Sequence, residues 1–125
     1  NDSGEVINPL LLAGQVHGGV AQGVGQALME DVTYDRDGQI LAGSFLDYCM
    51  PRADDLPMIE TSDFVEACQT NPLGVKGGGE SGTVGSIASA VNAIVDALSE
   101  YGVKDIDMPV TPLRVSGAIQ AGKAA

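Results

Sequence analysis

Apolar residues recur at helical spacing in residues 81–101 more regularly than elsewhere in the chain. Intervals of three, four and seven residues place them on one stripe of a helix. Ser81 or Thr83 can cap the first turn, because a hydroxyl oxygen accepts a hydrogen bond from an unpaired backbone N–H there. Gly102 is the expected stop. The apolar stripe consists of Val84, Ile87, Ala88, Val91, Ile94, Val95 and Leu98.

Residues 10–30 predict a second helix with an unusual composition. Val16, Val20, Val24, Ala27 and Leu28 form its apolar stripe, and Gln15, Gln22 and Gln26 follow another side. It also contains Gly18, Gly19, Gly23 and Gly25. Each Gly costs about 0.5–1 kcal/mol relative to Ala in a helix interior, so tertiary contacts must hold the helix. The glycines fit either close packing of helix on sheet or a Gln-and-Gly face against a polar ligand.

The intervening segments predict a small sheet. Residues 32–41 place an Asp-Arg-Asp-Gly turn between β-rich runs, which indicates a hairpin. Residues 58–68 alternate weakly and predict another strand, residues 1–9 the end of a strand with its loop, and residues 44–57 a surface loop broken by prolines. A short last helix is expected over residues 111–120.

This order of elements predicts the α+β class, with two main helices packed on a small mixed or antiparallel sheet. At 125 residues the whole chain, 1–125, is expected to be a single domain without an internal repeat. It opens at Asn1 without an initiator Met and closes with a tail of small residues, so we interpret it as the C-terminal fragment of a longer polypeptide.

Charge and cysteine content narrow the function. The net charge of −11 argues against binding to nucleic acid or to an anionic membrane surface, which need clustered Lys and Arg. No apolar run approaches 18 residues, so no transmembrane helix is expected. Cys49 and Cys68 are too few for a disulfide framework, and two free thiols are typical of a reducing, cytoplasmic location.

The segment with the most chemical promise is residues 71–85, which hold Lys76, Glu80 and six glycines. Glycines at that density let a backbone approach a ligand closely. Glu80, at the mouth of the predicted helix, is a candidate general base, although a plain helix-start carboxylate fits the same position. The Gly77–Gly82 run also matches the GxGxxG pattern of dinucleotide sites, but Glu80 would then oppose a pyrophosphate with like charge. No Lys follows Gly82, so a phosphate-binding P-loop is excluded.

His17 lies in the glycine-rich helix. It has no second histidine and no neighbour at metal-ligand spacing. We therefore interpret it as a partly buried, hydrogen-bonding residue, and we assign no metal ligand in this chain.

Several motifs in a fixed order make the chain resemble the C-terminal part of the molybdenum-binding large subunit of the xanthine oxidase family. That family includes aldehyde oxidoreductases, aerobic carbon monoxide dehydrogenases and N-heterocycle hydroxylases. The resemblance runs through nearly the whole chain and rests on the segments Asp2-Ser3-Gly4, Ile7-Asn8-Pro9, GQVHGGVAQG from Gly14, SFLDY from Ser44, GVKGGGESG from Gly74, AVNAI from Ala90 and TPLRV from Thr111.

The resemblance implies roles for four residues. Glu80 would be the catalytic base, taking a proton as a water-derived oxygen attacks an electrophilic carbon of an aldehyde or N-heterocycle. Gln15 would touch the molybdopterin cofactor, and Gly78 and Gly79 would bring backbone close to it. In bacterial members the cofactor is usually the cytosine dinucleotide form, and electrons leave through iron–sulfur and FAD units on other chains.

The resemblance also implies what this chain lacks. Family large subunits are several times longer, and most of their pterin and substrate contacts lie outside the matching region. No segment resembles the Cys-bearing loop of true carbon monoxide oxidisers. We therefore expect the isolated chain to hold no cofactor and to be inactive as an oxidoreductase until joined to the remainder of the large subunit. The alternative is a non-catalytic, stand-alone binding or assembly module of the same fold, which would self-associate through an exposed apolar face.

Overall fold

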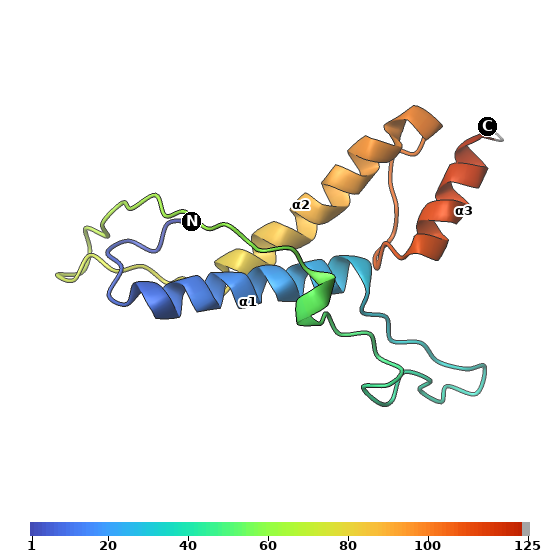
Figure 1. The fold of residues 1–125 in the computed structure, drawn as a ribbon, viewed down its shortest axis with the longest axis horizontal. Coiled ribbons are helices and arrows are strands. Elements are labelled where there is room, and N and C mark those ends of the chain that lie inside the picture. The colour runs from blue at the N-terminus through green and yellow to red at the C-terminus, as the bar shows by residue number, and fades with distance from the viewer. Residues whose placement is uncertain (124–125) are drawn as a thin grey trace.

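Residues 1–123 are described by a computed structural model, and they form three α-helices in an open, elongated arrangement (Figure 1). Helix α1 spans Pro9–Leu28, α2 spans Ser81–Leu98 and α3 spans Pro112–Lys123. Two short 3₁₀ turns, η1 at Ala53–Asp55 and η2 at Ser99–Tyr101, complete the regular structure of these residues. The last two residues of the predicted tail, 124 and 125, lie outside the described part.

All three predicted helices are confirmed, and their ends have physical causes. Asn8 caps α1, because its side-chain oxygen accepts a hydrogen bond from the Leu11 N–H at 3.1 Å. Gly102, with φ 78°, ends the turn that follows α2, as expected of a residue without a Cβ. The predicted Ser81 or Thr83 cap is wrong. Glu80 occupies the N-cap position without a capping side-chain bond, and the Ser81 hydroxyl donates to the Gly78 carbonyl at 3.1 Å.

The glycines of α1 serve a close crossing with α2, which Figure 1 shows at the start of α2. A Cβ added at Gly19 would lie 3.0 Å from the backbone nitrogen of Thr83. One added at Gly82 would lie 2.7 Å from the Val16 carbonyl oxygen, and one at Gly23 would lie 2.7 Å from the Thr83 carbonyl oxygen. Of the two alternatives for these glycines, close packing is confirmed at Gly19 and Gly23, but the partner is a helix and not a sheet.

The predicted α+β sheet is wrong. Within residues 1–123, β-pairing is limited to two isolated antiparallel bridges, Gly4 with Val75 and Tyr34 with Ile40. The hairpin turn does form, with Gly38 at φ 81°, but its arms separate after one bridge. Residues 58–68 run extended and largely exposed, and the Phe64 N–H donates to the Asn1 carbonyl at 2.7 Å. A strand needs a neighbour along its length, and the described residues supply none.

Little of the apolar surface is buried. The buried hydrophobic residues are Val16, Ala27, Leu98, Val103 and Val110. Large apolar side chains lie in the open on both helices and on the loops, among them Leu10, Leu11, Phe45, Leu46, Phe64 and Val84. Leu10 and Leu11 are adjacent at the start of α1, and contiguous exposed apolar surface is unusual on a self-sufficient monomer.

One finding departs from the expectation about membranes. The segment Ser81–Tyr101, with a mean hydropathy of 1.2 and few of its residues buried, is long and apolar enough to cross a bilayer by length and composition. That is weak evidence, because a helix buried inside a larger protein passes the same test.

Candidate functional site

Glu80 lies at the junction of the glycine loop, residues 77–79, and the first turn of α2. Its backbone carbonyl accepts the first helical hydrogen bond, from the Val84 N–H at 3.0 Å, while its side chain is exposed and makes no capping bond. The helix dipole favours a negative charge at this end. The carboxylate is therefore placed where it can meet a ligand brought to the start of α2.

Gln15 and the turn that carries Glu80 are brought together. The Gln15 side-chain amide donates to the Gly79 carbonyl at 2.7 Å, across 64 positions of sequence. One step further along the same stripe, the Gln22 side-chain oxygen accepts a hydrogen bond from the Thr83 hydroxyl at 3.4 Å. The glutamine stripe of α1 thus faces the start of α2.

The surface around this turn is made largely of backbone. A Cβ added at Gly14, Gly18, Gly77 or Gly79 would meet no atom within 4 Å, so these positions face open space. Gly78 is different, because a Cβ there would lie 2.7 Å from the Ser3 hydroxyl oxygen. A large, flat ligand could approach the open positions without displacing side chains. The glycines therefore fit a bulky cofactor, and Gly78 keeps the loop close to the N-terminal segment.

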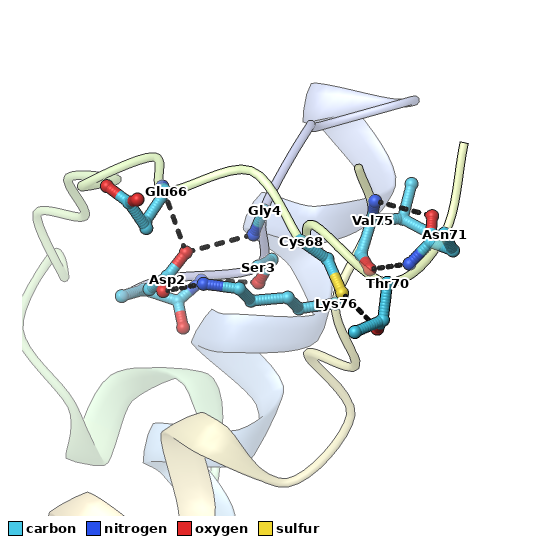
Figure 2. Close-up of polar contacts among 10 residues, drawn as sticks. Asp2, Ser3, Gly4, Glu66, Cys68, Thr70, Asn71, Val75 and Lys76 are labelled. Atoms are coloured by element: carbon cyan, nitrogen blue, oxygen red, sulfur yellow. Dashed lines mark hydrogen bonds and ion pairs between the residues drawn. The ribbon is translucent and has the colours of Figure 1, made fainter. Parts of the chain in front are cut away.

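Asp2 and Lys76 form an ion pair beside the glycine loop that sequence reasoning did not assign (Figure 2). The Lys76 ammonium lies 2.6 Å from the Asp2 carboxylate. Hydrogen bonds from Lys76 first, and then from the Gly4 N–H, lower the pKa of Asp2 from its ordinary 3.8 to about 2. The only sequence signal was that each residue lies within a motif of the family, which says nothing about their contact.

Three further candidates gain no site. No group of three or more His, Cys, Asp or Glu residues at metal-binding positions occurs in the described residues, so His17 stays unassigned as a ligand. Cys49 and Cys68 are both free thiols, as predicted. Hydrogen bonding from Thr70 lowers the pKa of the Cys68 thiol.

The strand–helix–strand unit that a GxGxxG dinucleotide site needs is absent from residues 1–123.

Comparison with known proteins gives consistent matches. A family model described as a molybdopterin cofactor-binding domain matches residues 1–57, which include Gln15 but not Glu80. The nicotine 6-hydroxylase large subunit of Paenarthrobacter nicotinovorans is 41% identical over 114 residues, 91% of this chain and 14% of that protein. The carbon monoxide dehydrogenase large chain of Hydrogenophaga pseudoflava is 39% identical over 115 residues, 92% of this chain and 14% of that protein.

A solved structure extends the likeness to three dimensions. The reconstituted CO dehydrogenase from Oligotropha carboxidovorans matches 98% of this chain with a TM-score of 0.92 and 34% sequence identity, and the match covers 15% of the solved chain. This chain therefore spans only a small part of the proteins that it matches. Its open arrangement of helices also occurs within a much longer chain.

Proposed function

Because this chain belongs to the molybdenum-binding large subunits of the xanthine oxidase family, we propose that it forms one wall of the cofactor site of a molybdenum hydroxylase. The proposed enzyme oxidises an aldehyde or an N-heterocycle with water as the source of oxygen. Glu80 is its general base. The observation that carries the proposal is the Gln15–Gly79 hydrogen bond, which joins the glutamine face of α1 to the turn bearing Glu80.

The residues of the site suit a molybdopterin cofactor. The open backbone at Gly77 and Gly79 leaves room for the cofactor beside the start of α2. The Gln15 side-chain nitrogen donates to Gly79, so the side-chain oxygen of Gln15 would contact the cofactor. Gly78 and Gly79 supply backbone at close range. When bound, the cofactor supplies the redox centre that accepts two electrons from the substrate. We propose the cytosine dinucleotide form.

Glu80 performs the proton chemistry. Its carboxylate takes a proton from the water-derived oxygen as that oxygen attacks an electrophilic carbon. A general base must reach this proton at hydrogen-bonding distance, and the short turn between the glycine loop and α2 presents the carboxylate without neighbouring bulk. Exclusion of water from the exposed carboxylate requires the remainder of the large subunit, which we propose as the partner that covers this face.

The exposed apolar surface supports the same assembly. A stand-alone module would leave Leu10, Leu11 and Val84 in water, whereas the solved CO dehydrogenase chain contains the same arrangement within a much longer polypeptide. The apolar length of α2 is then explained by burial in protein, without a bilayer. Iron–sulfur and FAD subunits are the proposed electron acceptors, and a cytoplasmic location remains a prediction from the two free thiols.

The decisive test is Glu80→Gln in the complete, molybdenum-loaded enzyme. Turnover of benzaldehyde or quinoline with an artificial electron acceptor should fall by about 10²–10⁴-fold, the usual contribution of a positioned base, while molybdenum content stays normal. Glu100→Gln is the matched control, since it is exposed in the turn that follows α2, about 30 Å along the helix axis from Glu80. Full activity of Glu80→Gln on a substrate that the unaltered enzyme oxidises would contradict the proposal.

A further inference from the structure

The glycine loop follows Lys76, which is held by both its backbone and its side chain. The Lys76 backbone N–H donates to the Ser3 carbonyl at 2.9 Å, and its ammonium pairs with Asp2 at 2.6 Å. The Glu5 N–H also donates to the Gly74 carbonyl at 2.9 Å, just before the loop. Backbone and side chain together therefore hold the start of the loop on the N-terminal segment.

Asp2 joins three stretches of the chain that are distant in sequence. Besides the Lys76 ammonium, its carboxylate accepts hydrogen bonds from the Gly4 N–H at 3.0 Å and the Glu66 N–H at 3.3 Å (Figure 2). An isolated surface ion pair contributes little, but two backbone donors here fix the carboxylate in one orientation. In Asp2→Asn the amide oxygen could still accept the two backbone bonds made to Oδ1, but the Lys76 ammonium, which pairs with Oδ2, would lose its charged partner.

The far end of the loop has its own anchor. The Gly79 carbonyl accepts the bond from Gln15, and Gly78 lies against Ser3. The three glycines between Lys76 and Glu80 have more backbone freedom than any other residues. Two anchors, one at each end, are what can hold such a loop in a single conformation.

We propose that Asp2 is a positioning residue for Glu80, acting through Lys76 to fix the start of the glycine loop. The proposal rests on the proposed role of Glu80 as the base. In this proposal Asp2 acts without contacting substrate or cofactor, since its carboxylate already accepts from Lys76, Gly4 and Glu66. Its effect is geometric, because a shift of about 1 Å in a catalytic group can cost about 10²-fold in rate.

The test uses the complete, molybdenum-loaded enzyme with benzaldehyde or quinoline as the substrate. In Asp2→Asn and in Lys76→Met, kcat should fall by about 10- to 100-fold with KM changed less than about 2-fold, since the ground-state contacts remain. Molybdenum content should not change. Hydrogen–deuterium exchange of the peptide containing residues 77–79 should accelerate in both variants. Combining the two substitutions should cost no more than either alone.

Two further variants separate positioning from general damage. Lys76→Arg keeps a cation within reach of Asp2 and should restore most of kcat and the slow exchange. Asp31→Asn removes a carboxylate of similar exposure from a pair with Arg114 at 3.6 Å, on the α3 side of the molecule, and should change neither.

Three results would overturn the proposal: unchanged kcat and exchange in Asp2→Asn, strictly additive losses in the double variant, or loss of activity explained by lost molybdenum. Glu80→Gln measured in the same preparation keeps the two hypotheses apart. If that variant turns over normally, the proposed base is wrong. The exchange of residues 77–79 in Asp2→Asn still decides whether Asp2 holds the loop.

Discussion

The two ends of α2 are built differently. At its start, Glu80 and Gly82 lie among glycines, and the contacts are backbone atoms and polar side chains. At its end Leu98 is buried, as is Val103 in the segment that follows, with 7% and 8% of their surfaces exposed. The same segment then runs back to α1, where the Val110 N–H donates to the Ala27 carbonyl at 2.6 Å and the Val110 side chain is 4% exposed.

This contrast separates stability from access. Buried apolar side chains stabilise the far end by removing hydrocarbon from water. The start of α2 buries little hydrocarbon, and its backbone and the Glu80 carboxylate stay open to a ligand. The same helix thus carries a packed end that holds the fold and a sparse end that serves the site.

Breaking the glycine crossing should give the largest effect on stability. In Gly82→Ala the new Cβ would meet the Val16 carbonyl oxygen at 2.7 Å, so the helices must separate, at a cost of about 2–3 kcal/mol in the free energy of unfolding. Gly85→Ala is the matched control on the same helix, where a Cβ meets nothing within 4 Å. It should stabilise by about 0.5–1 kcal/mol. Urea unfolding followed by far-ultraviolet circular dichroism measures both, and equal effects would contradict the close crossing.

A change in the buried segment that runs from the packed end of α2 back to α1 should have a smaller effect. Val110→Ala removes buried hydrocarbon and should lower the free energy of unfolding by about 1–2 kcal/mol. Val32→Ala, at a position 48% exposed, should change it by less than about 0.5 kcal/mol. The same urea experiment applies. A cost at Val110 no larger than at Val32 would show that the contact between the segment after α2 and the end of α1 does not hold the fold.

The smallest expected effect is the pH dependence of the stability that Asp2 contributes beside the start of α2. Folding lowers the pKa of Asp2 from 3.8 to about 2, so its contribution to stability is fully present above pH 3.8 and is lost as the pH falls toward 2. The difference in stability between the unaltered chain and Asp2→Asn should therefore be constant from neutral pH to about pH 5 and shrink below pH 3.8. Urea midpoints at several pH values measure it. A difference that grows on acidification would contradict the assigned direction.

Local pattern predicted the helices well. Apolar periodicity located α1 and α2 to within a few residues, and Pro112 marked the start of α3. The sheet was mispredicted, because residues 32–41 and 58–68 have β-type composition but no partner strand among residues 1–123. Composition reports what a segment can pair with and not whether a partner is present.

The site was only partly predictable. Gln15 and Glu80 were singled out from the sequence, and the hydrogen bond between Gln15 and Gly79 places their segments together. Asp2 and Lys76, 74 positions apart, were not paired in advance. No periodicity or spacing encodes such a contact, because it depends on how the N-terminal segment folds back over the glycine loop.

The backbone-to-backbone crossing of α1 and α2 has a consequence for redesign. The spacing between the glutamine face and the Glu80 turn is set near Gly19 and Gly82 by main-chain atoms, which do not change when neighbouring side chains are exchanged. Substrate-contacting side chains contributed by other parts of a large subunit could be swapped freely while this spacing stays the same. The crossing therefore keeps one distance in the site constant while side chains elsewhere in the large subunit change the substrate specificity.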